Sequence, residues 1–270
     1  MVVFLWQNLG FIVRLSSSSY EGFVMQRNQL TSYLNELLAI DNYKDYAPNG
    51  LQVEGITEIK KIVTGVTACQ ALIDAAIAEG ADAILVHHGY FWKNEQAVIT
   101  GFKQQRIKKL LVNDINLYGY HLPLDGHEEL GNNAQLAKLW GLEDITPQPG
   151  LIRLGRLADK LSIDEFKSLV SDSLNRDVLH LPGGPKEIET IAWCSGGAQG
   201  YIDQAIEWQA DVYISGEVSE QTTHLAKECG IHYFAAGHHA TERVGIKALG
   251  EHLAQNFNFD VKFIDIVNPV

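Results

Sequence analysis

The sequence has little cysteine, and its three cysteines, Cys69, Cys194 and Cys229, form no Cys-x-x-Cys pair. A disulfide-framed secreted domain needs a denser and even-numbered set. Sparse, unpaired thiols are typical of a reducing compartment, so we expect a cytoplasmic protein.

The sequence also lacks long apolar runs and an excess of positive charge. No segment reaches the about eighteen consecutive apolar residues that a membrane span requires, so we expect no membrane contact. The formal net charge is −12, whereas a nucleic-acid surface needs a positive footprint, so direct nucleic-acid binding is not expected. The chain of 270 residues is long enough for one large or two medium cores.

The first 24 residues are apolar, contain a run of four serines, and match no secretory signal, because Arg14 follows the apolar core instead of preceding it. From Met25 onward, apolar residues recur at helical spacing, namely Leu30, Tyr33, Leu34, Leu37 and Leu38. We therefore predict that residues 1–24 are a non-native or mis-assigned extension and that Met25 opens the folded chain.

From residue 61 onward, apolar runs alternate with segments of helical periodicity, which is typical of an α/β architecture with a mostly parallel sheet. Residues 62–66 predict a strand. The helix that follows is expected to be capped by Thr67 and to end at Gly80. Residues 83–86 then predict a second buried strand.

Two adjacent histidines, His87 and His88, follow this second strand directly. Neighbouring residues on a strand point to opposite faces, so both rings can converge only if the backbone changes course. We therefore expect the strand to end at Val86 and a loop to carry the two histidines.

The second half of the chain repeats the first. A shift of 129 residues, without gaps, reproduces eight of the 21 residues from 62 to 82. The matched residues are Ile62, Gln70, Ile73, Asp74, Ala76, Ile77, Ala81 and Asp82 with Ile191, Gln199, Ile202, Asp203, Ala205, Ile206, Ala210 and Asp211. In this register His87 and His88 correspond to Gly216 and Glu217.

The duplication predicts an α/β fold of two similar lobes. We assign residues 25–145 to the first lobe, completed by residues 245–270, and residues 146–244 to the second. Residues of about 141–190 lie between the repeated segments and are expected to form a connector, with a helix opened by a capping box from Ser162 to Glu165.

Each half places a histidine four residues before a carboxylate, after a strand: His121 with Asp125, and His238 with Glu242. On a helix, residues i and i+4 share a face, so each pair can reach a common point. Together with the histidine pair at 87–88, these side chains follow strand ends, where open α/β sheets place their sites.

Imidazole and carboxylate ligands without thiolates suit a divalent transition metal such as zinc, iron, manganese or nickel. The candidate ligands are His87, His88, Asp125, His238 and Glu242. Four or five ligands exceed the three typical of one catalytic zinc, which favours two ions that share a bridging carboxylate, with Glu242 as the bridge. The alternative is a hydrogen-bonded polar cluster without a metal.

A glycine-rich segment, CSGGAQG at residues 194–200, follows a predicted strand. Its backbone N–H groups could hold a phosphate, but it matches neither of the common phosphate-binding patterns, so a tight turn that needs glycine is the favoured interpretation. Cys194 is a weak candidate for a nucleophile, because no histidine is near it in sequence.

Several longer motifs resemble the NIF-three-like family, also labelled the GTP cyclohydrolase I type 2 family, in its short bacterial YbgI-like form. The resemblance runs from Met25 to the C-terminus. The motifs that carry it are DYAPNGLQVEG, VTGVTACQALIDAAIAEGADAILVHHGYFW, NDINLYGYHLPLD, GNNAQLA, SGEVSEQ and AAGHHATER.

The resemblance implies two similar α/β lobes, a toroidal homohexamer, and a dinuclear metal site in each subunit. The family's ligands fall on the same residues, His87, His88, Asp125, His238 and Glu242. His121 and His239 are outside that set, and we retain them as candidates for proton transfer or for orienting the ligands.

The family label implies a metal-dependent hydrolase that acts on a nucleotide-like substrate, in the manner of a GTP cyclohydrolase. Arg243, directly after Glu242, is a candidate for contacting a triphosphate. A metal hydrolase of another substrate class fits the same ligands. The alternative from a different class is a non-enzymatic metal-binding or interaction scaffold.

Overall fold

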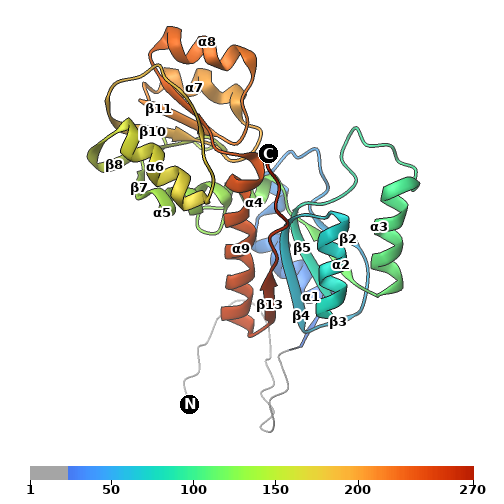
Figure 1. Ribbon diagram of the computed structural model, residues 1–270. Helices are drawn as coiled ribbons and strands as arrows, with labels where there is room; N and C mark the ends of the chain where they lie inside the picture. Colours follow the sequence, from blue (N-terminus) through green and yellow to red (C-terminus); the bar gives the residue numbers. More distant parts are fainter. Residues whose placement is uncertain (1–23) are drawn as a thin grey trace, which may run out of the picture.

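The protein consists of two α/β lobes, which a computed structural model describes for residues 24–270 (Figure 1). The predicted extension, residues 1–24, lies outside the described residues except for its last residue. None of the helices between residues 24 and 270 is long and apolar enough to cross a membrane.

The first lobe contains a five-stranded sheet and a short two-stranded one. Its elements are β1 (Met25–Gln26), α1 (Arg27–Leu37), η1 (Ile40–Asn42), β2 (Gly50–Val53), β3 (Glu58–Ile59), β4 (Lys61–Thr67), α2 (Gln70–Glu79), β5 (Ala83–His88), α3 (Gly101–Val112), β6 (Asn116–Gly119) and α4 (Leu122–Gly126). The strand order is β13-β4-β5-β6-β2, where β13 (Asp260–Phe263) returns from the C-terminus and only the β2 pairing is antiparallel.

The second lobe contains a six-stranded sheet in the order β7-β8-β10-β11-β12-β9. Its elements are α5 (Asn132–Trp140), β7 (Leu142–Asp144), β8 (Arg153–Ser162), α6 (Ile163–Leu174), β9 (Leu179–Leu181), β10 (Glu187–Trp193), η2 (Gln199–Tyr201), α7 (Ile202–Glu207), β11 (Val212–Ser215), α8 (Glu220–Cys229) and β12 (His232–Ala235). The long helix α9 (His238–Phe257) follows and leads to β13.

Helices cover both faces of the first sheet, which explains the continuous apolar runs in its strands. On β5, Ala83 and Leu85 pack with α1 and α9, whereas Ile84 and Val86 pack with α2 and α3. The second sheet is covered in the same way, by α5 and α6 on one face and by α7 and α8 on the other. The predicted α/β class is therefore confirmed.

The two lobes repeat each other in the predicted register. Ile62 pairs with Ala83 across β4 and β5, and Ile191 pairs with Val212 across β10 and β11, so both positions shift by 129. Asp82 Oδ2 accepts hydrogen bonds from the N–H groups of residues 60 and 61, and Asp211 Oδ2 accepts them from residues 189 and 190. The same aspartate, directly before β5 and β11, thus binds the backbone of the neighbouring strand β4 or β10 in each copy, which confirms the duplication.

The helix boundaries follow local signals in most places. Gly80 ends α2 with φ +66°, and Ser162 opens α6 with the predicted capping box. The predicted cap at Thr67 is wrong, because β4 continues through that residue and Cys69 precedes α2. Thr67 is held in the ladder by its pairing with His88.

Residues 141–190 are more than the connector that we expected. They contribute β7, β8 and β9 to the second sheet, all of them in antiparallel pairings. The match that we found, of residues 62–82 with residues 191–211, did not reach these strands. In the structure β9 begins 129 residues after β2, and both are antiparallel strands at the edge of their sheets, so the repeat extends farther than the sequence identities indicated.

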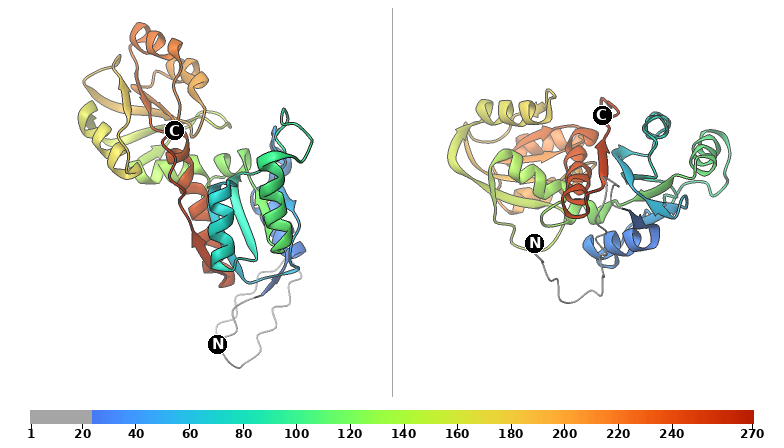
Figure 2. Two further views of the ribbon diagram at one scale, coloured as in Figure 1. Left: turned by 45° about the vertical axis from the view of Figure 1, so that its right-hand side comes forward. Right: turned by 90° about the horizontal axis from the view of Figure 1, so that it is seen from below.

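Helix α9 joins the two lobes. It packs on β4, β5 and β13 of the first sheet and on α5, which belongs to the second core (Figures 1 and 2). A Cβ added at Gly245 would lie 2.5 Å from Asn132 Oδ1, so a glycine is needed where α9 meets the start of α5.

Two fully buried asparagines at the start of α5 tie the lobes together. Asn132 donates to Asp125 Oδ1 at 2.9 Å and accepts from the Gly245 N–H at 2.8 Å. Asn133 accepts from the Ser195 N–H at 2.9 Å and donates to the carbonyl oxygens of Asp125 and Leu151. This junction fixes Asp125 of the first lobe against the second lobe.

We expect Asn133→Ala to lower the free energy of unfolding by about 2 to 4 kcal/mol, because the buried Ser195 N–H would lose its acceptor and two carbonyls a donor. Urea unfolding followed by tryptophan fluorescence measures this change. Gln135→Ala on the same helix removes a solvent-exposed hydrogen bond and should cost less than about 1 kcal/mol. Equal effects of the two substitutions would contradict the role given to the junction.

Candidate metal centre

The centre of the site is the carboxylate of Glu242, in the first part of α9. Its side chain is 3% exposed. Oε1 lies 3.3 Å from His87 Nε2 and 3.1 Å from His238 Nε2, and Oε2 lies 3.3 Å from His88 Nε2. His238 and Glu242 are one turn apart on α9, as the spacing predicted.

Strand β5 delivers His87 and His88, and it does so without the predicted loop. The ladder to β6 stops at Val86, but the ladder to β4 continues to the pair Thr67–His88, so the prediction that the strand ends at Val86 was wrong. The two ring centroids still lie 4.6 Å apart. Both rings reach the Glu242 carboxylate, His87 at Oε1 and His88 at Oε2.

Asp125 lies on the other side of His87. Its Oδ2 is 3.6 Å from His87 Nε2, and its Oδ1 accepts hydrogen bonds from Asn132 and from the Ser195 hydroxyl, the latter at 2.8 Å. The aspartate is thus oriented from both lobes. One oxygen is used by these donors, and the other faces the histidines.

His121, the residue that precedes α4, joins the same cluster. Its ring centroid is 5.1 Å from that of His87 and 5.7 Å from that of His88. Its Nδ1 lies 2.9 Å from Asp45 Oδ1.

The four clustered histidines share one arrangement: an oxygen holds Nδ1 of each ring. The partners are the Tyr120 carbonyl for His87, the Thr67 hydroxyl for His88, Asp45 for His121 and Glu217 for His238. Fixing one ring nitrogen leaves Nε2 to face the cluster, which is how metal-binding histidines are usually oriented.

The structure does not bring His239 to this cluster. Its Nε2 lies 2.8 Å from Asp265 Oδ1, and Arg243 bonds the other oxygen of Asp265 at 2.9 Å and also the Leu174 carbonyl. Residues 239 and 243 thus form a separate ion-paired group. The Arg243 side chain, our candidate for a triphosphate contact, is already used there.

The glycine-rich segment after β10 forms a wall of the site. A Cβ at Gly196 would lie 2.2 Å from Glu242 Oε1, and φ is +66°. The N–H groups of Ser195 and Gly196 donate to Asn133 and Thr241, so these amides are not free for a phosphate. The tight-turn interpretation fits this geometry.

Cys194, beside this wall, does not have the properties of a nucleophile. The side chain is buried, and burial raises the pKa of its thiol well above the usual value. The thiol form is not nucleophilic, so the geometry gives no support to that candidate.

The imidazoles and carboxylates of the cluster shift one another's pKa values. Burial lowers the pKa of His87, but Asp125 and Glu242 outweigh it and raise that pKa to about 9. The pKa of His238 is also raised to about 9, because its carboxylate neighbours outweigh burial. Burial lowers the pKa of His88 to about 3. For Glu242, burial raises the pKa, but the imidazoles hold it well below its usual range.

The cluster fits a divalent cation. Among the described residues, His87 Nε2 and Glu242 Oε2 are buried atoms without a hydrogen-bond partner. Buried polar atoms are rarely left so, and these two belong to residues of one possible ligand set. There are three sets of residues in which the possible ligand atoms all lie within 4.8 Å of one another. They are His87, His88 and His121; His88, His238 and Glu242; and His87, Asp125 and Glu242. Nitrogen and oxygen ligands of this kind bind divalent transition metals.

Several residues that orient the cluster were missed in the sequence. Glu217 aligns with His88 in the duplication, which was a usable signal. Asp45 lies in the DYAPNG segment and is 3% exposed, and Asn49 of the same segment donates to its carboxylate. Ser195 carried no signal, because its contact with Asp125 joins residues 70 positions apart.

The fold and the site together define a class of protein: a duplicated two-lobed α/β protein with a buried cluster of histidines and carboxylates at the junction of its lobes. A family model described as Duf34/NIF3 (NGG1p interacting factor 3) matches residues 25–269. The chain belongs to this family, which confirms the resemblance seen in its motifs.

Relatives of known sequence match over most of the chain. A Haemophilus influenzae protein named GTP cyclohydrolase 1 type 2 homolog is 57% identical over 250 residues, which cover 91% of this chain and 100% of that protein. A Yersinia pestis protein of the same name is 56% identical over 246 residues, with the same coverage.

Solved structures show the same fold. The protein ybgI, described as of unknown function, matches with a TM-score of 0.89 and 53% identity. A second protein, TTHA1606 from Thermus thermophilus, matches with a TM-score of 0.85 and 34% identity. Each match covers 91% of this chain and 100% of the other.

We expect Asp45→Asn to destabilise the protein by about 1 to 3 kcal/mol at pH 7, because an amide group would replace an oxygen that accepts hydrogen bonds. Burial raises the pKa of Asp45, but hydrogen bonds from His121 and Asn49 hold it well below its usual value. A carboxyl group whose pKa is lowered by folding stabilises the folded state at pH values above its pKa in the unfolded chain, which is near 4. This stabilisation is lost as the pH falls below that value.

The difference between wild type and Asp45→Asn should therefore shrink by roughly 1 kcal/mol between pH 7 and pH 3. Urea unfolding at the two pH values measures it. A difference that is independent of pH would show that the charge of Asp45 contributes nothing.

Proposed function

We propose that the protein is a metal-dependent hydrolase with two divalent ions in each chain, held by His87, His88, Asp125, His238 and Glu242. The observation that carries the proposal is a pair of buried atoms without a hydrogen-bond partner, His87 Nε2 and Glu242 Oε2, on two residues of one possible ligand set.

Two ions are supported by the way the ligand sets overlap. One set contains His88 and His238, another contains His87 and Asp125, and Glu242 is common to both. Oε2 of Glu242 lies next to His88, and Oε1 lies next to both His87 and His238, so this carboxylate touches both sets and would be the ligand that two ions share. Zinc, iron, manganese and nickel all accept these ligands.

Bound divalent ions would supply Lewis-acid polarisation of the substrate and lower the pKa of water. The chain's own residues would orient the substrate and exchange protons with it. Asp45 holds Nδ1 of His121, which leaves Nε2 as the nitrogen that can take up or release a proton next to the cluster. We assign the proton-transfer role to His121 and not to His239, whose Nε2 is engaged by Asp265.

A nucleotide-like substrate is supported by the relatives named GTP cyclohydrolase 1 type 2 homolog. We take GTP as the first substrate to test, with hydrolytic opening of the guanine ring as the reaction.

A homohexameric ring and a cytoplasmic location are further expectations from the family. The return of the chain to the first lobe near residue 245 is also our proposal, and the pairing of β13 with β4 supports it. We propose that the first boundary lies before α5 and not at residue 145, because α5 packs in the second core and β7 pairs with β8.

We expect about two equivalents of transition metal per chain in protein purified without chelator, and a loss of most of this metal in His238→Ala. Plasma mass spectrometry measures both. His239→Ala is the matched variant, because it removes the next imidazole on the same helix but one that contacts Asp265. Equal metal content in all three proteins, or none in wild type after reconstitution, would refute the metal centre.

We expect metal-loaded protein to hydrolyse GTP and Glu242→Gln to lower kcat at least roughly 100-fold, since this substitution removes the shared carboxylate. Turnover is measured by chromatography of the products. Glu251→Gln, an exposed position farther along α9, is the control and should retain full activity. Metal-loaded protein without turnover on GTP and on a panel of nucleotides and phosphoesters would favour a metal-binding or interaction scaffold.

A further inference from the structure

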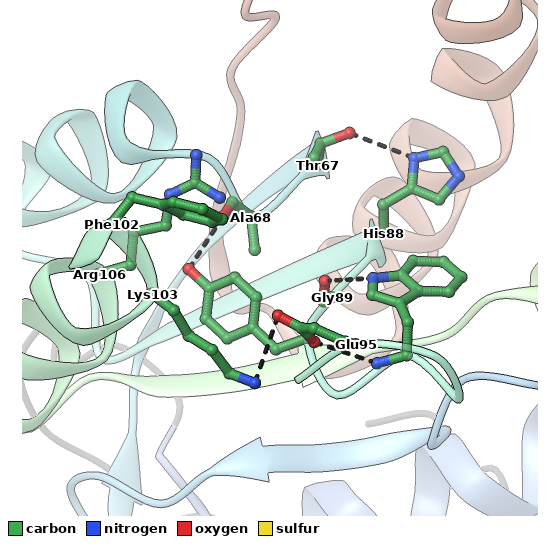
Figure 3. A pocket seen from close by; sticks show the side chains of 10 residues that line it. Thr67, Ala68, His88, Gly89, Glu95, Phe102, Lys103 and Arg106 are labelled. Atoms are coloured by element: carbon green, nitrogen blue, oxygen red, sulfur yellow. Dashed lines mark hydrogen bonds and ion pairs between the residues drawn. The ribbon is translucent and has the colours of Figure 1, made fainter. Parts of the chain in front are cut away.

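A pocket opens directly beside the histidine cluster, and the proposed ligands do not account for it. Its cavity measures about 280 Å³, and His88 and Thr67 form one end of it. Figure 3 shows Phe102, Lys103 and Arg106 of α3 at the other side of the pocket. Because His88 belongs to the lining of the pocket and also to the histidine cluster, a molecule in the pocket would touch the cluster.

Trp92 forms the wall between the pocket and the cluster. Its ring centroid lies 5.8 Å from that of His88 and 5.0 Å from that of His121. The indole N–H donates to the Gly89 carbonyl at 3.1 Å, which fixes the ring. The wall is therefore aromatic, and the same ring lines the pocket and contacts His121, the proposed proton-transfer residue.

The acidic residue in the pocket, Glu95, is already neutralised. Its Oε1 lies 3.3 Å from Lys103 Nζ, and its Oε2 accepts hydrogen bonds from the N–H groups of Phe91 and Trp92. Lys103 in turn donates to the Gln96 carbonyl. This charge pair contributes no net charge to the pocket.

Arg106 is the charge that remains. Among residues 24–270 its guanidinium has no ion pair or hydrogen-bond partner, and its Nε is buried without a partner. The guanidinium lies 5.0 Å from the ring centroid of Phe102, a residue that is 67% exposed. An aromatic ring fixes the fork of Arg106 but leaves its N–H groups without an acceptor.

We propose that this pocket binds the phosphate groups of the substrate, with Arg106 as their anchor. The inference rests on the proposed function, since it requires a substrate that reaches the histidine cluster with its other end. A planar guanidinium donates two parallel hydrogen bonds to a phosphate, a geometry that suits an otherwise unpartnered arginine. In a chain of net charge −12, an uncompensated arginine next to the site is a specific attraction for an anion.

Isothermal titration calorimetry of metal-loaded full-length protein with GTP and with guanosine tests this proposal. We expect wild type to bind GTP at least roughly tenfold more tightly than guanosine. Arg106→Gln should weaken GTP binding by about 10- to 100-fold and leave guanosine binding and metal content unchanged. Lys108→Gln removes an exposed charge from the same helix outside this pocket and should change GTP binding less than about twofold.

Unchanged GTP binding by Arg106→Gln, or GTP and guanosine bound equally or not at all by wild type, would overturn the inference. The outcome is separable from that of the proposed function. Arg106-dependent GTP binding without turnover would leave the phosphate pocket standing and remove the hydrolase. Turnover of GTP with an unchanged KM in Arg106→Gln would support the hydrolase and refute the phosphate pocket.

Discussion

The structure depends on how one buried carboxylate is compensated. An ionised carboxylate that is removed from water needs partners of opposite charge or strong donors, because the desolvation cost is otherwise several kcal/mol. Glu242 obtains three imidazoles, two from the end of β5 and one from its own helix. Apolar residues pack α9 against the first sheet and so bring Glu242 to the histidines of β5. The carboxylate in turn requires a glycine at residue 196, where no Cβ would fit.

The two lobes must keep a fixed relative orientation if the histidines and carboxylates of the cluster are to stay together. Apolar residues of α5 and α9 pack together, and the asparagines of α5 add hydrogen bonds to this contact. Asn132 joins Asp125 to α9, and Asn133 joins Asp125 to the strand end that carries Ser195. Hydrogen bonds have preferred directions, so a fully satisfied network fixes orientation as well as distance. Around a site with three sets of ligand atoms, orientation decides whether they face a common point.

The sequence predicted much of this because its signals are local or repeated. The period of 129 residues gave the two lobes and their register, and the four-residue spacing of His238 and Glu242 gave a shared helix face. The end of β5 was not predictable, since the ladder to Thr67 is a pairing with a distant strand. For the same reason the partners of the imidazoles, such as Asp45 and Glu217, became visible only in the folded chain. The adjacent histidines at 238 and 239 were also hard to tell apart, although one faces the cluster and the other Asp265, because sequence spacing gives no rotation about the helix.

The two copies have the same backbone register but are no longer interchangeable. Where the first copy ends its strand with two imidazoles, the second has Gly216 and Glu217, and the glycine there approaches the Cα of His238 so closely that an added Cβ would lie 2.6 Å from it. Replacing the second strand end with a copy of the first would therefore put a histidine where only hydrogen fits and would remove the carboxylate that orients His238. The two strand ends therefore cannot be exchanged, although they occupy the same place in the repeat.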